Sequence, residues 1–329
     1  MHEIRLFPIV LASLLFPVLH AAPARAAPPP KVWVSNAGAD NATCGAIVSP
    51  CKSFQQAHNN VATGGEVSVL TPGDYVTGPG LSITKSVGIT NDGSGEASIL
   101  APGFTGIFID AGTGGTVSLR GLVLEGAATS SATGIYVNSG SALHVQNCVI
   151  RDYEGSPGWG IQFSPVGDSK LFVSDTIVFN NGSIADSGGI LVLPQSTATA
   201  AVVLDRVHLE NNVLGLRVDG TISTGTGSRV VVRDSVVSGN AGDGIIAITA
   251  AGHAPAFIIV ERISSVDNAG NGLIANGPHA TMLLDGNVVA RNGTGLSALS
   301  SGQLLSYGNN KVNNNIGPDG TPTGSYSPI

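Results

Sequence analysis

The sequence has little charge, few aromatic side chains and few cysteines. Only 11% of its 329 residues are charged and 5% are aromatic, and it contains three cysteines. An average soluble domain has about 25% charged residues. The 15 Lys and Arg residues against 22 Asp and Glu give a formal net charge of −7. Because nucleic-acid binding needs clustered Lys and Arg, this composition argues against nucleic acid as a partner.

Long hydrophobic runs are also missing, except near the N-terminus. Residues 6–19 form an apolar run after Arg5, and the small-residue pattern Ala-Arg-Ala follows at 24–26. This arrangement is typical of a secretory signal peptide. The run is too short, and too interrupted by proline, for a membrane-spanning helix. We therefore expect residues 1–26 to be a signal peptide, the mature protein to be secreted to a periplasmic or extracellular location, and no membrane span.

The three cysteines have different expected roles. Cys44 and Cys51 flank a short turn, and in an oxidising compartment we expect them to form a local disulfide. The alternative, a metal site, would need two further ligands, and only His58 is near in sequence. Cys148 occupies an inward position of the repeat described below, which predicts a buried, inert thiol rather than a nucleophile.

Glycine is abundant, with 45 residues, and internal repeats dominate the chain. Six apolar segments align with one another, and they are 143–150, 171–178, 202–209, 230–237, 258–265 and 282–289. Most copies, and a last one that starts at residue 304, have Asn ten residues after their start, namely Asn181, Asn212, Asn240, Asn268, Asn292 and Asn314. A Gly-Ile or Gly-Leu pair opens a further strand in each repeat, at Gly106, Gly134, Gly160, Gly189, Gly215, Gly244, Gly272 and Gly295.

A repeat this short, with strands that alternate in period two, cannot bury its apolar face alone. It must stack on copies of itself, each strand pairing with its equivalent in the next coil. Three short strands in each coil predict an all-β parallel β-helix of about ten coils. The Asn column predicts a ladder in which each side-chain amide bonds the turns above and below it.

The repeat pattern over residues 66–316 resembles the right-handed parallel β-helix proteins of the pectin lyase-like superfamily. Residues 50–75, PCKSFQQAHNNVATGGEVSVLTPGDY, resemble the capping segment of these proteins, a short amphipathic helix followed by a Gly-Gly turn. Such a segment covers the open end of the core. We therefore expect an N-terminal segment and capping helix at 27–65, the β-helix at 66–316 and a loose C-terminal tail at 317–329.

The same resemblance implies that the strand opened by each Gly-Ile or Gly-Leu pair carries a substrate groove on its outer face. Alternation turns the second and fourth residues after each glycine outward. The first outward column is predicted to be Phe108, Tyr136, Gln162, Leu191, Arg217, Ile246, Ile274 and Ser297. The second outward column is predicted to be Asp110, Asn138, Ser164, Leu193, Asp219, Ile248, Asn276 and Leu299.

These columns and the adjacent loops supply candidate catalytic residues, which are Arg217, Asp219 and His253. A polysaccharide lyase needs a cation to stabilise enolate-like charge and a base near the sugar C5. Arg217 would neutralise a uronic acid carboxylate or abstract the proton beside it, and Asp219 would hold Arg217 or, with Asp110, bind Ca²⁺. Calcium stays open as a cofactor, and no metal site is assigned. The alternative for Arg217 and Asp219 is an exposed ion pair without catalytic function.

The candidate substrate-binding residues are Phe108, Tyr136, Asn138, Gln162, Asn276 and His279. Phe108 and Tyr136 could stack on sugar rings. His253 and His279 lie in loops from which they could reach the groove, although a lone loop histidine is usually solvated.

Catalytic motifs of the superfamily are not intact. The segment 241–244, Ala-Gly-Asp-Gly, is similar to a hydrolase motif, but the neighbouring coils place Gly188, Leu214 and Asn271 at the position of Asp243. Glycoside hydrolysis needs two carboxylates, so we assign no hydrolase site. The Trp-Ile-Asp-His and Arg-x-Pro-x-x-Arg runs of pectate lyases are also absent.

The strand formed by the aligned segments predicts two further features. Its outward charges, Asp205, Arg233, Glu261 and Asp285 together with Asp175, Arg206, Asp234 and Arg262, mostly alternate in sign, which favours stacking in register. Its apolar outward residues, Phe172, Val203, Val231, Ile259, Leu283 and Leu305, combine with Leu191, Ile246 and Ile274 into an apolar outer strip. Because a monomer rarely exposes so long a strip, either loops and the tail cover it or it binds a partner.

Two functions stay open at this point. The first is a secreted enzyme that acts on extracellular polysaccharide, as a lyase on a glycan that contains uronic acid. The second is a non-catalytic surface or adhesive module, which binds glycan, a second subunit or a partner protein through the apolar outer strip.

Overall fold

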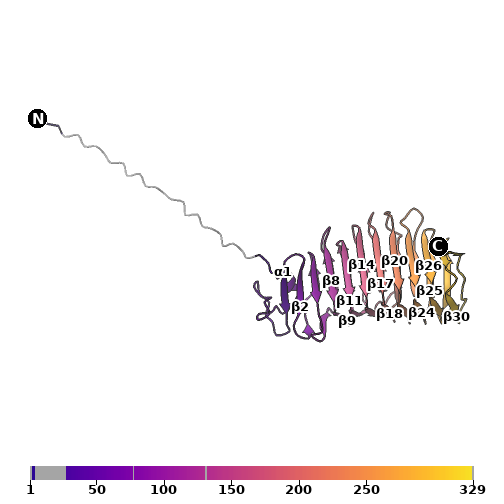
Figure 1. Ribbon diagram of the computed structural model, residues 1–329, viewed down its shortest axis with the longest axis horizontal. Helices are drawn as coiled ribbons and strands as arrows, with labels where there is room; N and C mark the ends of the chain where they lie inside the picture. Colours follow the sequence, from indigo (N-terminus) through magenta and orange to yellow (C-terminus); the bar gives the residue numbers. More distant parts are fainter. Residues whose placement is uncertain (1, 4–26, 77, 130–131, 328–329) are drawn as a thin grey trace.

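The computed structural model describes residues 2–3, 27–76, 78–129 and 132–327. The predicted signal peptide lies almost entirely outside these residues. Figure 1 shows an elongated solenoid, with the helix α1 (Phe54–Asn60) at its N-terminal end and the C-terminus at the opposite end. Within the described ranges, no helix has the length and apolar character needed to cross a membrane.

Three parallel sheets run along the solenoid. The twelve-stranded sheet consists of β1 (Lys31–Val34), β2 (Gly65–Val69), β5 (Val87–Thr90), β8 (Thr116–Arg120), β11 (Ala142–Gln146), β14 (Ser169–Ser174), β17 (Ala200–Asp205), β20 (Ser228–Arg233), β23 (Ala256–Glu261), β26 (Ala280–Asp285), β29 (Gln303–Ser306) and β31 (Gly324–Ser325). The ten-stranded sheet consists of β3 (Gly73–Asp74), β6 (Ala97–Leu100), β9 (Val123–Thr129), β12 (Val149–Tyr153), β15 (Ile177–Phe179), β18 (His208–Glu210), β21 (Val236–Ser238), β24 (Ser264–Val266), β27 (Val288–Ala290) and β30 (Lys311–Asn313). The nine-stranded sheet consists of β4 (Leu81–Ile83), β7 (Ile107–Asp110), β10 (Thr133–Ser139), β13 (Trp159–Phe163), β16 (Gly188–Val192), β19 (Leu214–Asp219), β22 (Ile245–Ile248), β25 (Asn271–Asn276) and β28 (Thr294–Leu299).

Each coil takes one strand from the twelve-, the ten- and the nine-stranded sheet, in that order. The described part of the chain contains nine complete coils, from β2 to β28, close to the ten expected. The aligned segments pair in the predicted register, for example Val202 with Val230 and Val230 with Ile258. Their inward aliphatic side chains form one continuous core along the solenoid. The all-β parallel β-helix is therefore confirmed.

The asparagine ladder is also confirmed between the ten- and nine-stranded sheets. The backbone N–H of Asn212 donates to Oδ1 of Asn240 at 2.9 Å, and that of Asn240 donates to Oδ1 of Asn268 at 3.2 Å. These side chains are at most 1% exposed. The ladder thus supplies acceptors for turn N–H groups that water cannot reach.

The last rung of the ladder differs from the prediction. Asn315, not Asn314, accepts the backbone N–H of Asn292, at 2.9 Å. The last coil carries one extra residue in the turn after β29, so Asn310 occupies the place of Asn287, and every later position shifts by one. Asn315 in turn donates its backbone N–H and its Nδ2 to Asp319, at 3.1 and 2.8 Å, so a carboxylate ends the ladder.

The repeated glycines pack directly on this ladder. A Cβ atom at Gly215 would lie 3.2 Å from Nδ2 of Asn240 and 2.4 Å from the carbonyl oxygen of Gly244. Equivalent contacts occur at Gly189 and Gly272. The repeated asparagines and the repeated glycines of the sequence therefore pack closely against each other.

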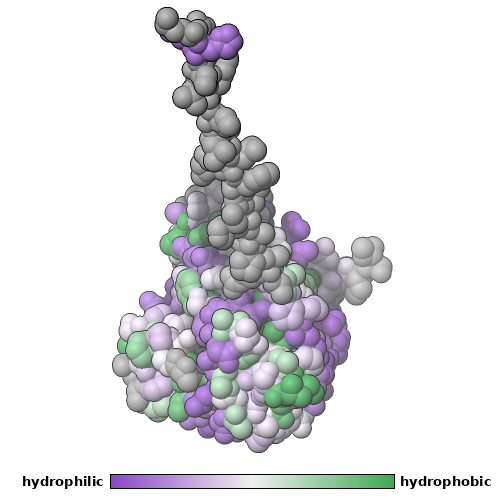
Figure 2. All heavy atoms as spheres, turned by 90° about the vertical axis from the view of Figure 1, so that its left-hand side faces the viewer, coloured by the Kyte–Doolittle hydropathy of each residue, from purple (hydrophilic) through white to green (hydrophobic). Residues whose placement is uncertain are grey.

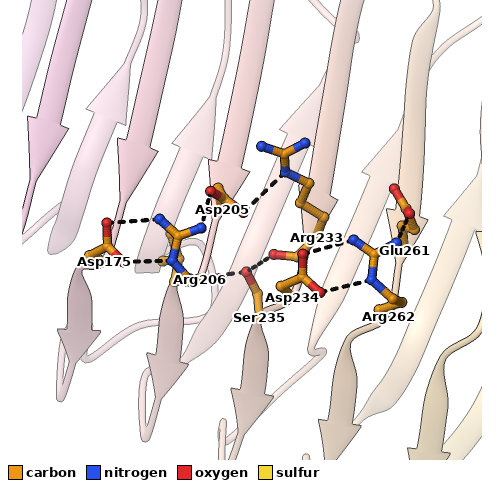
Figure 3. A network of polar contacts seen from close by, with 9 residues as sticks. Asp175, Asp205, Arg206, Arg233, Asp234, Ser235, Glu261 and Arg262 are labelled. Carbon is orange, nitrogen blue, oxygen red and sulfur yellow. Dashed lines mark hydrogen bonds and ion pairs between the residues drawn. The ribbon is translucent and has the colours of Figure 1, made fainter.

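Stacked charges hold the turns between the twelve- and ten-stranded sheets (Figure 3). Nε and Nη2 of Arg206 donate to Asp175 at 2.7 and 3.0 Å, and the same atoms of Arg262 donate to Asp234 at 2.9 and 2.8 Å. These hydrogen bonds lower the pKa of both carboxyl groups. All four residues have φ between 49° and 53°. The alternating charges thus stack in register, as the sequence predicts.

The predicted capping helix is confirmed as α1. Oγ of Ser53 caps it by accepting the N–H of Gln56 at 3.2 Å, and Phe54 is fully buried. An additional strand, β1, precedes the helix and pairs with β2. Figure 2 looks onto this end, where hydrophilic residues are interspersed with small apolar areas.

The disulfide Cys44–Cys51 is formed, which excludes its sulfur atoms as ligands of the alternative metal site. The loop closed by this disulfide forms backbone hydrogen bonds with the outer edge of β1. The N–H of Trp33 donates to the carbonyl of Gly45, and the N–H of Cys51 donates to the carbonyl of Trp33, both at 2.9 Å. Because an open edge invites pairing with other chains, this loop protects the N-terminal end of the twelve-stranded sheet. Burial raises the pKa of the Cys148 thiol to about 11, in agreement with the predicted inert thiol.

The C-terminal segment is not loose over its described length, contrary to the prediction. β31 pairs with β29, and the carbonyls of Pro318 and Asp319 accept the N–H groups of Gly295 and Leu296, both at 2.9 Å. The last coil would otherwise leave these backbone groups without partners, so the chain folds back to satisfy them.

The buried His58 predicts that the N-terminal cap is sensitive to acid. Its Nε2 accepts the N–H of Thr84 at 3.2 Å, so the neutral ring carries its proton on Nδ1. Burial, and then the charge of Lys85, lower the pKa of His58 below its usual value of 6.5. A histidine with a lowered folded-state pKa stabilises the fold above the unfolded-state pKa, and this stability is lost as pH falls through the folded-state pKa.

We therefore expect the free energy of unfolding to fall between about pH 7 and about pH 5, and His58→Gln to reduce that fall. Urea titrations at both pH values measure it. His144→Gln is the matched control, because His144 is exposed. Equal pH dependence in both variants would contradict the assignment.

Candidate functional site

The first outward column pairs in the predicted register on eight of the nine strands of this sheet, from β7 to β28. Phe108, Tyr136, Gln162, Leu191, Arg217, Ile246, Ile274 and Ser297 pair in successive strands in this order. In the second column, Asp219, Ile248, Asn276 and Leu299 also pair in register. The register shifts after Val137, so Asp110 pairs with Ser139 and not with Asn138.

A groove crosses the first strands of this face. The rings of Phe108 and Tyr136 stack almost parallel, with their centroids 5.6 Å apart and an angle of 7° between them. Phe108 is 38% exposed. A hollow of about 470 Å³ is lined by Thr105, Phe108, Ala132, Thr133, Tyr136, Asn138, Pro157 and Gln162. Four of the six predicted substrate-binding residues therefore line one hollow.

A second hollow extends the first toward the N-terminal cap. It has a volume of about 230 Å³ and is lined by Gln55, Pro79, Gly80, Leu81, Ser82, Thr105 and Phe108. Because the two hollows share Thr105 and Phe108, we call them together the aromatic groove. It runs from β4 to β13, three strand spacings or about 14 Å.

Polar atoms border the aromatic rings. Asp110 accepts hydrogen bonds from Nδ2 of Asn138 at 3.1 Å and from Oγ of Ser139 at 2.5 Å. The bond from Ser139, and then that from Asn138, lower the pKa of Asp110, which keeps this carboxylate ionised. Nε2 of Gln162 donates to Ser164 at 3.4 Å, whereas its buried Oε1 has no protein partner. The groove therefore offers side-chain amide groups beside the rings of Phe108 and Tyr136.

Arg217 and Asp219 form a partly buried ion pair, not the exposed pair that was the alternative. Nε and Nη2 of Arg217 donate to Asp219 at 3.0 and 2.7 Å, and Nη1 donates to Asp186 at 2.6 Å. The Asp219 side chain is 6% exposed, and its other oxygen accepts the N–H and Oγ1 of Thr221 at 2.8 and 2.6 Å. Two carboxylates thus balance the charge of Arg217, which ties the loop with Asp186 and the turn at Thr221 to the sheet.

An apolar cluster separates Arg217 from the aromatic groove. Leu191 lies between Gln162 and Arg217 in the column, is 6% exposed, and packs with Trp159 and Leu214 outside the main core. Arg217 therefore lies two strand spacings, or about 10 Å, beyond the last groove residue.

The other predicted site residues are not assembled with Arg217. Asn276 lies two strands further along the second column, and His279 is exposed in the following turn. His253 is half-buried, and its Nδ1 has no protein partner. Among the described residues no hydrogen bond joins any of the three to Arg217 or Asp219.

The structure places the two carboxylates that were predicted to bind calcium far apart. Asp110 and Asp219 are four strands apart in the sheet, or about 19 Å, too far to hold one ion together. Within the described ranges, the one group of three ligand-type residues is Asp40 with Cys44 and Cys51. Both cysteines are in the disulfide, and the Asp40 carboxylate already accepts the N–H groups of Lys52 and Ser53.

The residues of the predicted apolar outer strip differ in how far the structure buries them. Leu191, Ile246 and Ile274 on the nine-stranded sheet are 4–8% exposed and thus covered by the chain itself. Leu283 is also buried, whereas Phe172, Val203, Val231, Ile259 and Leu305 are half-buried.

Several groove and ion-pair residues escaped the sequence analysis. Thr105 and Thr133 each directly precede a repeat glycine, so a third column one residue before the glycine would have found them. Gln55 comes from α1 and Asp186 from a loop, and no periodic signal marks either residue.

Comparison with known proteins supports the fold. No protein-family model matches the sequence, and no curated protein matches it. Among solved structures, pectate lyase Pel9A superposes with a TM-score of 0.54 at 16% identity, covering 86% of this chain and 78% of that chain. An alginate lyase from Paenibacillus sp. str. FPU-7 also gives a TM-score of 0.54, at 15% identity, covering 90% of this chain and 98% of that chain. The chain therefore shares the right-handed parallel β-helix fold of these two solved structures, as the repeat pattern predicts.

Proposed function

We propose that this protein is exported and binds polysaccharide in the aromatic groove. The observation that carries the proposal is the stacked pair Phe108 and Tyr136, which lines a hollow on the outer surface of the nine-stranded sheet. Aromatic faces bind apolar surfaces such as the C–H faces of sugars, and a few well-placed polar groups then fix the orientation of the ligand. Asn138 and Gln162 supply such groups beside the rings.

Two further observations support the proposal. The solved proteins with this fold include a pectate lyase and an alginate lyase, both named for polysaccharides. The Cys44–Cys51 disulfide fits an oxidising compartment, as expected for an exported chain with the predicted signal peptide at 1–26.

A lyase on a glycan containing uronic acid is the second candidate. One observation favours it: Arg217 lies in the same outward column as Phe108, Tyr136 and Gln162. In this reaction Arg217 would stabilise negative charge next to the sugar C5, with Asp219 holding it. The two carboxylates already on Arg217, and the apolar cluster beside it, favour binding over catalysis.

The test is binding by the chain from Ala27 onward to a panel of neutral and acidic polysaccharides. We expect Phe108→Ala and Tyr136→Ala each to weaken binding about tenfold, because each removes one of the two aromatic rings that line the groove. Phe257→Ala is the matched control, since Phe257 is an equally exposed aromatic residue, at 36%, on the twelve-stranded sheet. Failure to bind any polysaccharide, or an equal loss in the control, would contradict the proposal.

The same incubations separate binding from catalysis. Ultraviolet absorbance detects unsaturated uronates, and a reducing-end assay detects any chain cleavage. A rise in both signals would establish a lyase and make Arg217 the first residue to replace. Reducing ends alone would indicate hydrolysis, and binding without either signal would leave a non-catalytic glycan-binding protein.

A further inference from the structure

We infer that the aromatic groove selects uncharged sugar residues and disfavours uronates. This inference rests on the proposed function and narrows its ligand to neutral polysaccharide. It starts from the lining of the two hollows, in which every residue is uncharged. A bound carboxylate would therefore lose hydration without gaining a cationic partner, which is costly.

The surrounding strands supply no cation beside the groove either. Across the nine strands of this sheet, all within the described residues, the charged side chains are Asp110, Arg217 and Asp219. Arg217 is held by Asp219 and Asp186, and the cluster of Leu191 with Trp159 and Leu214 lies between it and the groove. Arg217, whose positive charge could bind a uronate, is thus already paired with carboxylates and lies apart from the rings of the groove.

The charge that does border the groove is negative. Asp110 contacts the groove residue Asn138, and its hydrogen bonds from Ser139 and Asn138 lower its pKa. A uronate bound beside Tyr136 would therefore meet a like charge, whereas a hydroxymethyl group would not.

The polar groups that remain fit hydroxyl groups. Asn138 and Gln162 both line the hollow, and a side-chain amide offers both donor and acceptor atoms. Neutral sugars present hydroxyl groups that match both kinds of atom, and their apolar faces match the stacked rings.

The experiment compares matched polymers that differ only in the carboxylate. Polygalacturonate and alginate are each tested beside their carboxyl-reduced forms, which keep the linkages but carry hydroxymethyl groups, together with neutral glucan, galactan, arabinan and xylan. Binding is measured by calorimetry at low salt. We expect at least one neutral or reduced polymer to bind, and each reduced polymer to bind at least about tenfold more tightly than its acidic parent.

A variant of Asp110 tests whether its negative charge weakens the binding of acidic polymers. Asp110→Asn should raise affinity for the acidic polymers about threefold and leave affinity for the neutral ones unchanged. Acidic polymers that bind as tightly as their reduced forms, or more tightly, would overturn this inference and leave the proposed function standing. Binding to none of the polymers would overturn both. Loss of neutral binding in Asp110→Asn would also count against the inference.

Discussion

Asn240→Ala should lower the free energy of unfolding by about 3 kcal/mol. The substitution removes the acceptor of the Asn212 N–H and the donor to the carbonyl of Leu209, and it breaks the side-chain bond to Asn268 at 2.7 Å. Asn240 is 1% exposed, so water cannot replace these partners. Each buried polar group left without a partner costs about 1–3 kcal/mol. Urea unfolding followed by circular dichroism measures the loss.

Asn138→Ala is the matched control for this prediction. Asn138 is also an asparagine of the β-helix, but it lies half-buried on the outer face and donates its side-chain bond to the exposed Asp110. We expect it to lose less than about 1 kcal/mol. Equal losses in the two variants would refute a structural role of the ladder.

Gly215→Ala should be as damaging, although it adds only one methyl group. The new carbon would lie 2.4 Å from the carbonyl oxygen of Gly244 and 2.7 Å from Cγ1 of Val237. The carbonyl belongs to the next coil, so it cannot move without disturbing the sheet hydrogen bonds. Overpacking of this kind typically costs 1–3 kcal/mol, and we expect a loss of about 3 kcal/mol because the nearest contact is backbone.

Gly167→Ala provides the control, because no heavy atom lies within 4 Å of the carbon that it adds. Its effect on the free energy of unfolding should stay within about 0.5 kcal/mol. A Gly215→Ala variant as stable as Gly167→Ala would show that the repeated glycine is not required by close packing on the ladder.

The candidate site was predictable in part. Phe108, Tyr136 and Gln162 were identified because strand alternation fixes which residues point outward. Asn138 was also identified, although the shift in register after Val137 changes its strand partner. The predicted catalytic residues do not form one site. Arg217 is separated from the groove by an apolar cluster, and among the described residues no hydrogen bond joins His253 to Arg217.

The sequence by itself determined the repeats, the parallel β-helix, the first outward column and the register of the coils, except for the shifts after Val137 and after β29. These features follow from a local period that the covalent geometry of the strand imposes and that stacking then repeats in every coil. Only the tertiary structure decided which outward residues are accessible. Leu191 packs with Trp159 and Leu214, which begin the two neighbouring strands, and Arg217 is bound by Asp186 from a loop that folds back over the sheet. Loop paths have no period, so their contacts depend on the packing of the complete chain.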